Sequence, residues 1–74
     1  MSDSAVLENE IQQLWDVAQT LLAASKIELA PAIRLVADLR YCADRAHEAG
    51  YIGGEGQLRK AADELEARIR AQAG

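Results

Sequence analysis

The sequence predicts an all-α protein, either a small three-helix unit (up-down-up) or a helical hairpin that assembles into a dimeric helical bundle. Apolar residues recur at spacings of three and four along nearly the whole chain, which is the period of an amphipathic helix. Alanine, the best helix former, is abundant. The single proline, Pro31, and a cluster of four glycines over residues 50–56 divide the chain into three segments. Seventy-four residues indicate a single helical domain, residues 1–74.

The first predicted helix spans about residues 4–24, after a capping side chain at Asp3 or Ser4. Its apolar arc covers about half of the circumference, so we expect this helix to contact two neighbours. A chain of this size buries only roughly 60% of its unfolded surface and often completes its core by oligomerising. We therefore expect a homodimer, in which the self-association residues of the first helix are Leu7, Ile11, Leu14, Trp15 and Leu21.

The second predicted helix spans about residues 31–49, after a break over residues 25–30. Pro31 fits the first helical position because proline lacks only an N–H that has no helical partner there. A capping box formed by Ser25 and Glu28 is the alternative, in which Pro31 kinks a longer helix. Gly50 is typical of a left-handed C-terminal cap, after which Tyr51 can fold back over Ala46. The predicted buried side consists of Ala32, Leu35, Val36, Leu39, Cys42, Ala43 and Ala46.

The third predicted helix spans about residues 55–73, after a glycine-rich turn over residues 50–56. A narrow apolar stripe consists of Leu58, Ala62, Leu65 and Ile69. Ion pairs at i,i+4 spacing are expected on its exposed sides, namely Lys60/Glu64, Glu64/Arg68 and Glu66/Arg70.

The net charge of −4 lies entirely in residues 1–25, which carry no lysine or arginine. Nucleic-acid and membrane-surface binding both need a dense basic face, so neither is expected. The carboxylates Glu8, Glu10 and Asp16 define an acidic face that suits a basic protein surface. A lone cysteine, an acidic start and no apolar run near the ~20 residues of a membrane span favour the cytoplasm. The composition, rich in alanine and arginine, indicates a bacterial or phage origin.

No motif predicts catalysis, a metal site or a cofactor. The glycine cluster lacks the lysine-hydroxyl pair of a phosphate-binding loop. His47 and Cys42 lie five residues apart on one helix, hence about 140° apart around it, and cannot form a nucleophilic pair there. The last two helices resemble a helix-turn-helix only in outline, because the third carries carboxylates that phosphates would repel.

The most distinctive polar group lies on the second helix, where Arg40, Asp44 and His47 follow each other at spacings of four and three. Asp44 is expected to pair with both of its neighbours in this group. With Arg34, Tyr41 and Arg45, these residues form a predicted partner-binding set, although an ordinary charged boundary strip is the alternative.

We therefore expect a non-enzymatic interaction module that occludes or tethers a larger protein through helix faces. The alternatives are a phage-encoded inhibitor that sets its acidic first helix against a basic surface, and a purely structural oligomer-forming subunit.

Overall fold

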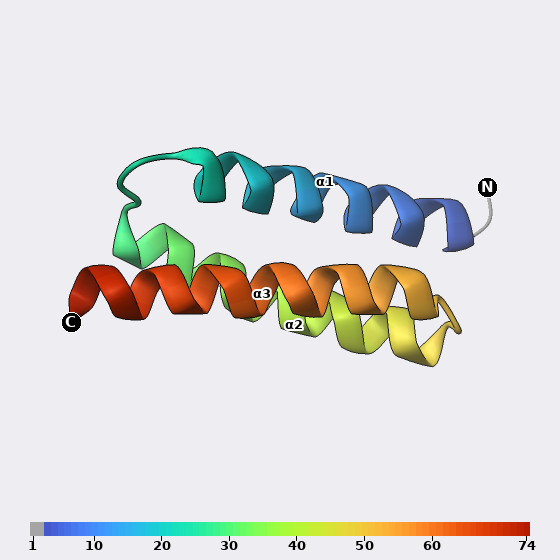
Figure 1. The fold of residues 1–74 in the computed structure, drawn as a ribbon. Coiled ribbons are helices and arrows are strands. Elements are labelled where there is room, and N and C mark those ends of the chain that lie inside the picture. Colours follow the sequence, from blue (N-terminus) through green and yellow to red (C-terminus); the bar gives the residue numbers. More distant parts are fainter. Residues whose placement is uncertain (1–2) are drawn as a thin grey trace.

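The protein is a three-helix unit with up-down-up topology (Figure 1). In the computed structural model, residues 3–74 are described, and their side chains from Ala5 onward. The helices are α1 (Asp3–Ala23), α2 (Leu29–Glu48) and α3 (Ile52–Ala73). The start of α1 and the end of α3 lie at opposite ends of an elongated molecule of 42 × 17 × 17 Å. The predicted all-α class is confirmed, whereas the capping role of Asp3 or Ser4 falls outside the described side chains.

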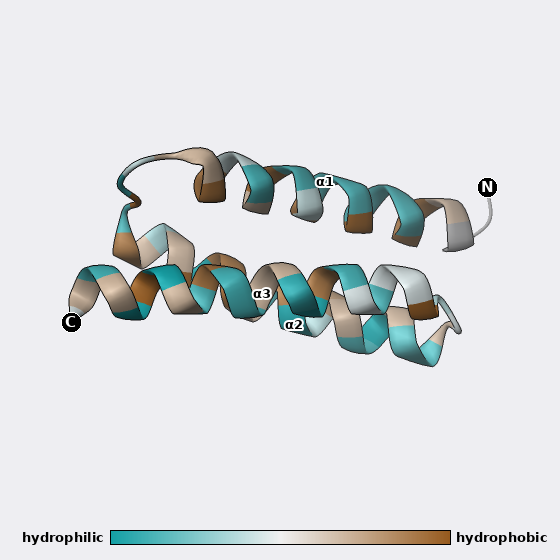
Figure 2. Cartoon of the chain, viewed as in Figure 1, coloured by the Kyte–Doolittle hydropathy of each residue, from teal (hydrophilic) through white to brown (hydrophobic). Residues whose placement is uncertain are grey.

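The core lies along the line where the three helices meet. The buried side of α2 consists of the seven residues predicted from periodicity. On α3, Leu58, Ala62 and Leu65 are buried as expected, and Ile69 packs against them from the edge. Leu39, Leu58 and Leu65 are the largest fully buried side chains. The apolar face of α1 is turned towards the other two helices (Figure 2).

Helix α1 contacts both α3 and α2, as predicted, but α2 and α3 share the more extensive contact. On α1, Leu7, Ile11 and Ala18 are buried. Val6 and Val17 remain about half exposed, and Val17 lies on the α1 edge that faces α2. The apolar arc of α1 is thus wider than the surface that its own chain covers.

The start of α2 differs from the prediction, because the helix begins at Leu29 and Pro31 is its third residue. The first helical hydrogen bond runs from Ala32 N to Glu28 O (3.2 Å), so the missing N–H of Pro31 removes no bond from the helix. The capping box does not form either: Glu28 is the N-cap in an extended conformation and makes no side-chain cap bond.

Side chains of α3 secure the α1–α2 connection. Gln72 Oε1 accepts a hydrogen bond from Ile27 N (3.0 Å), and Gln72 Nε2 donates to Ile27 O. Arg68 donates to Leu22 O (3.0 Å) and Ala24 O (2.8 Å), which satisfies carbonyls at the C-terminus of α1. The predicted Glu64/Arg68 pair is therefore replaced by contacts with α1. The predicted Glu66/Arg70 pair does form (3.1 Å).

The α2–α3 turn is shorter than predicted, and α3 begins at Ile52 rather than near residue 55. Gly50 caps α2 with φ 83°, as predicted, and Tyr51 N donates to Ala46 O (2.8 Å), closing a Schellman motif. The glycines at positions 53, 54 and 56 are therefore helical instead of belonging to a flexible turn. At Gly54 the lack of a side chain matters, since a Cβ there would lie 3.1 Å from Cδ1 of Ile11 on α1.

Candidate functional site

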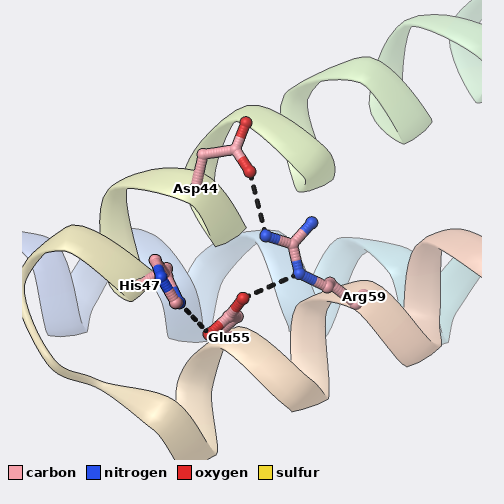
Figure 3. A network of polar contacts seen from close by, with 4 residues as sticks. All are labelled: Asp44, His47, Glu55 and Arg59. Carbon is pink, nitrogen blue, oxygen red and sulfur yellow. Dashed lines mark hydrogen bonds and ion pairs between the residues drawn. The ribbon is translucent and has the colours of Figure 1, made fainter.

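The polar group predicted on α2 is divided between partners on α3. His47 Nδ1 lies 2.9 Å from Glu55 Oε1, and Asp44 accepts a hydrogen bond from Arg59 Nη2 at 2.9 Å (Figure 3). Arg59 Nε also donates to Glu55 Oε2 at 2.9 Å, so four side chains form one network. The predicted pairing of Asp44 with Arg40 and His47 along α2 is wrong, because α3 packs close enough to present partners of its own.

Glu55 is the centre of this network. It lies in the first turn of α3, where the helix dipole favours a negative charge. Hydrogen bonds with His47 and then with Arg59 hold the pKa of this carboxyl below its ordinary value of 4.5. The network therefore joins the end of α2 to the start of α3 across the turn.

Arg40 joins the same two helices one turn further from the end. Its Nη1 lies 3.0 Å from Glu66 Oε2 and its Nη2 lies 3.6 Å from Asp63 Oδ1. The hydrogen bond from Arg40 lowers the pKa of Glu66. Three of the six predicted partner-binding residues thus contact α3 within the chain: Arg40 and Asp44 form ion pairs, and His47 forms a hydrogen bond.

Of the other three predicted partner-binding residues, Tyr41 and Arg45 lie beside α1, and helical spacing places Arg34 on the same side of α2. Arg45 Nη1 donates to Glu10 Oε2 of α1 at 2.6 Å, and its guanidinium carbon lies 5.9 Å from the centroid of the Tyr41 ring. The Tyr41 side chain is 67% exposed, and Arg34 is exposed two turns earlier. This side of α2 carries the aromatic and guanidinium groups that are enriched at protein interfaces.

A groove of about 380 Å³ runs between α1 and α2 at this place. Its lining is Glu10, Gln13, Leu14 and Val17 from α1, and Asp38, Tyr41, Cys42 and Arg45 from α2. We call these eight residues, together with Arg34, the α1–α2 face. Apolar atoms of Leu14, Val17 and Cys42 lie beside the exposed ring of Tyr41, so the face combines apolar lining with charged edges.

Sequence reasoning missed Gln13, Val17 and Asp38 as members of this face. Asp38 lies three residues before Tyr41 on α2, and Val17 lies on α1. Helical spacing from Tyr41 identifies Asp38, but only the packing of α1 against α2 brings Val17 beside them.

Cys42 is buried among the core residues. Burial, and secondarily the charge of Glu10, raises the pKa of its thiol, which disfavours the nucleophilic thiolate. The sulfur therefore contributes packing to the groove floor.

The acidic residues of α1 do not share one face. Glu10 is turned into the α1–α2 groove and is paired with Arg45. Asp16 accepts a hydrogen bond from Gln12 Nε2 at 3.0 Å, and Glu8 is exposed. Since residues 8 and 10 differ by about 200° around a helix, Glu10 points away from Glu8, whereas Asp16 lies only about 80° from Glu8.

The predicted self-association residues are largely used within the chain. Leu7 and Ile11 are buried, and Leu14, Trp15 and Leu21 are partly buried and pack against the core. A second copy would therefore need a different set of side chains as its main contact, unless α1 separated from the other helices.

Across residues 5–74, no three histidine, cysteine, aspartate or glutamate side chains gather as the ligands of a metal ion. None of the helices described between residues 3 and 74 has the length and apolar character needed to traverse a lipid bilayer. Comparison of the chain with protein-family models, with curated proteins and with solved structures gave no match.

Proposed function

We propose that this chain is a small non-enzymatic interaction module that binds a larger protein through its α1–α2 face and thereby occludes or tethers it. The observation that carries the proposal is the exposed ring of Tyr41 beside the half-exposed Val17, at a groove with an apolar floor. Aromatic and arginine side chains at such places contribute most of the binding energy in protein interfaces.

The side of α2 that contacts α3 supports this proposal indirectly. Ion pairs of Arg40 and Asp44, and the hydrogen bond of His47, join the second half of α2 to α3. A face built on a helix that is already fixed loses little conformational entropy when a partner binds. Occlusion or tethering needs only such a rigid surface, with no chemical step.

The experiment is a capture of partners from a host lysate with three immobilised baits: the wild type, the double variant Val17→Ser/Tyr41→Ala, and Ile52→Ala. Ile52 is a matched control because it is 77% exposed and lies away from the α1–α2 face, at the start of α3. We expect one protein to be retained in stoichiometric amount by the wild type and the control and lost by the double variant. Equal retention by all three baits would refute the assignment of this face.

The arrangement gives less support to the other two functions. An inhibitor that uses an acidic first helix needs its carboxylates on one side, whereas Glu10 is paired with Arg45 and points away from Glu8. A purely structural subunit needs a wide uncovered apolar surface, whereas most of the apolar face of α1 is covered by its own chain.

A further inference from the structure

The outer side of α2 carries a regular pattern of charge. Arg34, Asp38, Tyr41, Arg45 and Glu48 follow each other at spacings of four, three, four and three, so they form one line along the helix. We call these five residues the outer strip of α2. In chain order, the strip reads positive, negative, tyrosine, positive, negative. In the reverse order it reads negative, positive, tyrosine, negative, positive, so every charge changes sign.

This pattern is self-complementary for two antiparallel copies of α2. With Tyr41 opposite Tyr41 of a second copy, Arg34 and Glu48 lie seven residues on either side, about 10.5 Å from the centre. Arg34 of each copy then faces Glu48 of the other. Asp38 lies three residues from the centre and Arg45 lies four, so Asp38 of one copy and Arg45 of the other are offset along the helix axis by only about 1.5 Å. A twofold axis makes each contact twice, giving four intermolecular ion pairs.

The charges of the strip are available for such contacts. Among residues 5–74, Arg34, Asp38 and Glu48 take part in no ion pair, whereas Arg40 and Asp44 are paired with α3. Arg45 pairs with Glu10, but a guanidinium has five N–H donors and can also reach a second carboxylate.

Apolar surface beside the strip is left for a second copy to cover. Tyr41 is 67% exposed and Val17 is 49% exposed, next to Leu14 and Cys42 in the groove. At the centre of the antiparallel arrangement, the tyrosine of each copy lies beside this lining. A chain of this length has much to gain from such coverage because its own core is small.

We propose that a second copy of this chain binds the outer strip of α2, antiparallel, about a twofold axis at Tyr41. The proposal rests on the assignment above of the α1–α2 face as protein-binding, and it names a second copy as an occupant of that face. A larger partner and a second copy use the same side chains, so each excludes the other.

The test is sedimentation velocity of the wild type, Arg34→Glu and Glu48→Arg, over micromolar to millimolar concentrations, with circular dichroism to establish that each variant is folded. The wild type is expected to dimerise. Each single variant turns both Arg34–Glu48 contacts into repulsions, so we expect dimerisation to weaken roughly tenfold or more.

An equimolar mixture of the two variants is the decisive sample, because in a mixed dimer both contacts again join opposite charges. We expect the mixture to regain wild-type affinity. Lys60→Glu and Glu64→Arg on α3 repeat the same changes in net charge away from the strip, and neither they nor their mixture should alter dimerisation.

Two results would overturn the proposal. One is a wild type that stays monomeric throughout; the other is a dimer that the strip variants and their mixture leave unchanged. Neither result affects whether Val17→Ser/Tyr41→Ala loses a larger partner, so failure of the dimer is separable from failure of the proposed function.

Discussion

The close approach of α1 to the first turn of α3 can be tested at Gly54. This residue is helical, and a Cβ built on it would lie 3.1 Å from Ile11 Cδ1 and 3.6 Å from Ile11 Cγ2. Gly56 is a matched control two residues later in the same helix, where a Cβ meets nothing within 4 Å. Both glycines have negative φ, so neither substitution strains the backbone.

The expected changes in stability follow from the different surroundings of the two glycines. Gly56→Ala removes backbone freedom from the unfolded chain and should raise the free energy of unfolding by about 0.5–1 kcal/mol. For a domain of this size that is roughly 2–8 °C in Tm. Gly54→Ala has the same intrinsic gain, but carbon atoms prefer separations of about 3.5–4.0 Å, so the buried Ile11 side chain must move. We expect a smaller rise in Tm for Gly54→Ala, or none.

Valine should enlarge the difference in Tm between substitutions at positions 54 and 56. Gly54→Val adds two methyl groups against Ile11, and overpacking of this kind costs about 1–3 kcal/mol, or at least about 4 °C in Tm. Gly56→Val adds them to solvent and should leave Tm nearly unchanged. The assay is thermal unfolding followed by circular dichroism, with Trp15 fluorescence as a separate reporter for α1. If Gly54→Val were as stable as Gly56→Val, α1 would not lie against this turn of α3.

Three further predictions concern single side chains. Glu55 has a lowered pKa in the fold, so its contribution to stability is present above the ordinary pKa of 4.5 and is lost as the pH falls through the lower, folded pKa. Glu55→Gln should therefore flatten the decline of Tm in this acid range. An unchanged decline would contradict the network. Arg68→Ala removes hydrogen bonds to the end of α1 and should speed amide exchange in α1 by about tenfold, and in α2 much less; equal acceleration in both helices would argue against a specific clamp. Cys42 is buried with a raised pKa, so at neutral pH a disulfide reagent should modify it far more slowly in the native chain than in denaturant; equal rates would place the thiol at the surface.

Features that depend on local periodicity were predictable from the sequence. The buried side of α2 and the narrow stripe of α3 repeat at spacings of three and four, so one helix at a time reveals them. The cap at Gly50 was also predictable, because a left-handed residue after a helix favours glycine for a reason internal to that residue. The start of α2 was predicted two residues too late, since Pro31 is tolerated at several positions of a first turn.

The candidate site was only partly predictable. Arg34, Tyr41 and Arg45 were selected by residue type and spacing, and they lie together on the α1–α2 face. Val17 was missed because its exposure beside Tyr41 depends on how far α1 lies from α2.

The sequence by itself therefore determined the helical class, the inward faces and the cap at Gly50, which are set by interactions within a few residues. The tertiary structure alone decided that Asp44 pairs with Arg59, that Arg68 caps α1, and that α1 approaches α3 at Gly54. Charged side chains at a helix boundary have several partners of similar energy within reach, and the distance between packed helices selects among them.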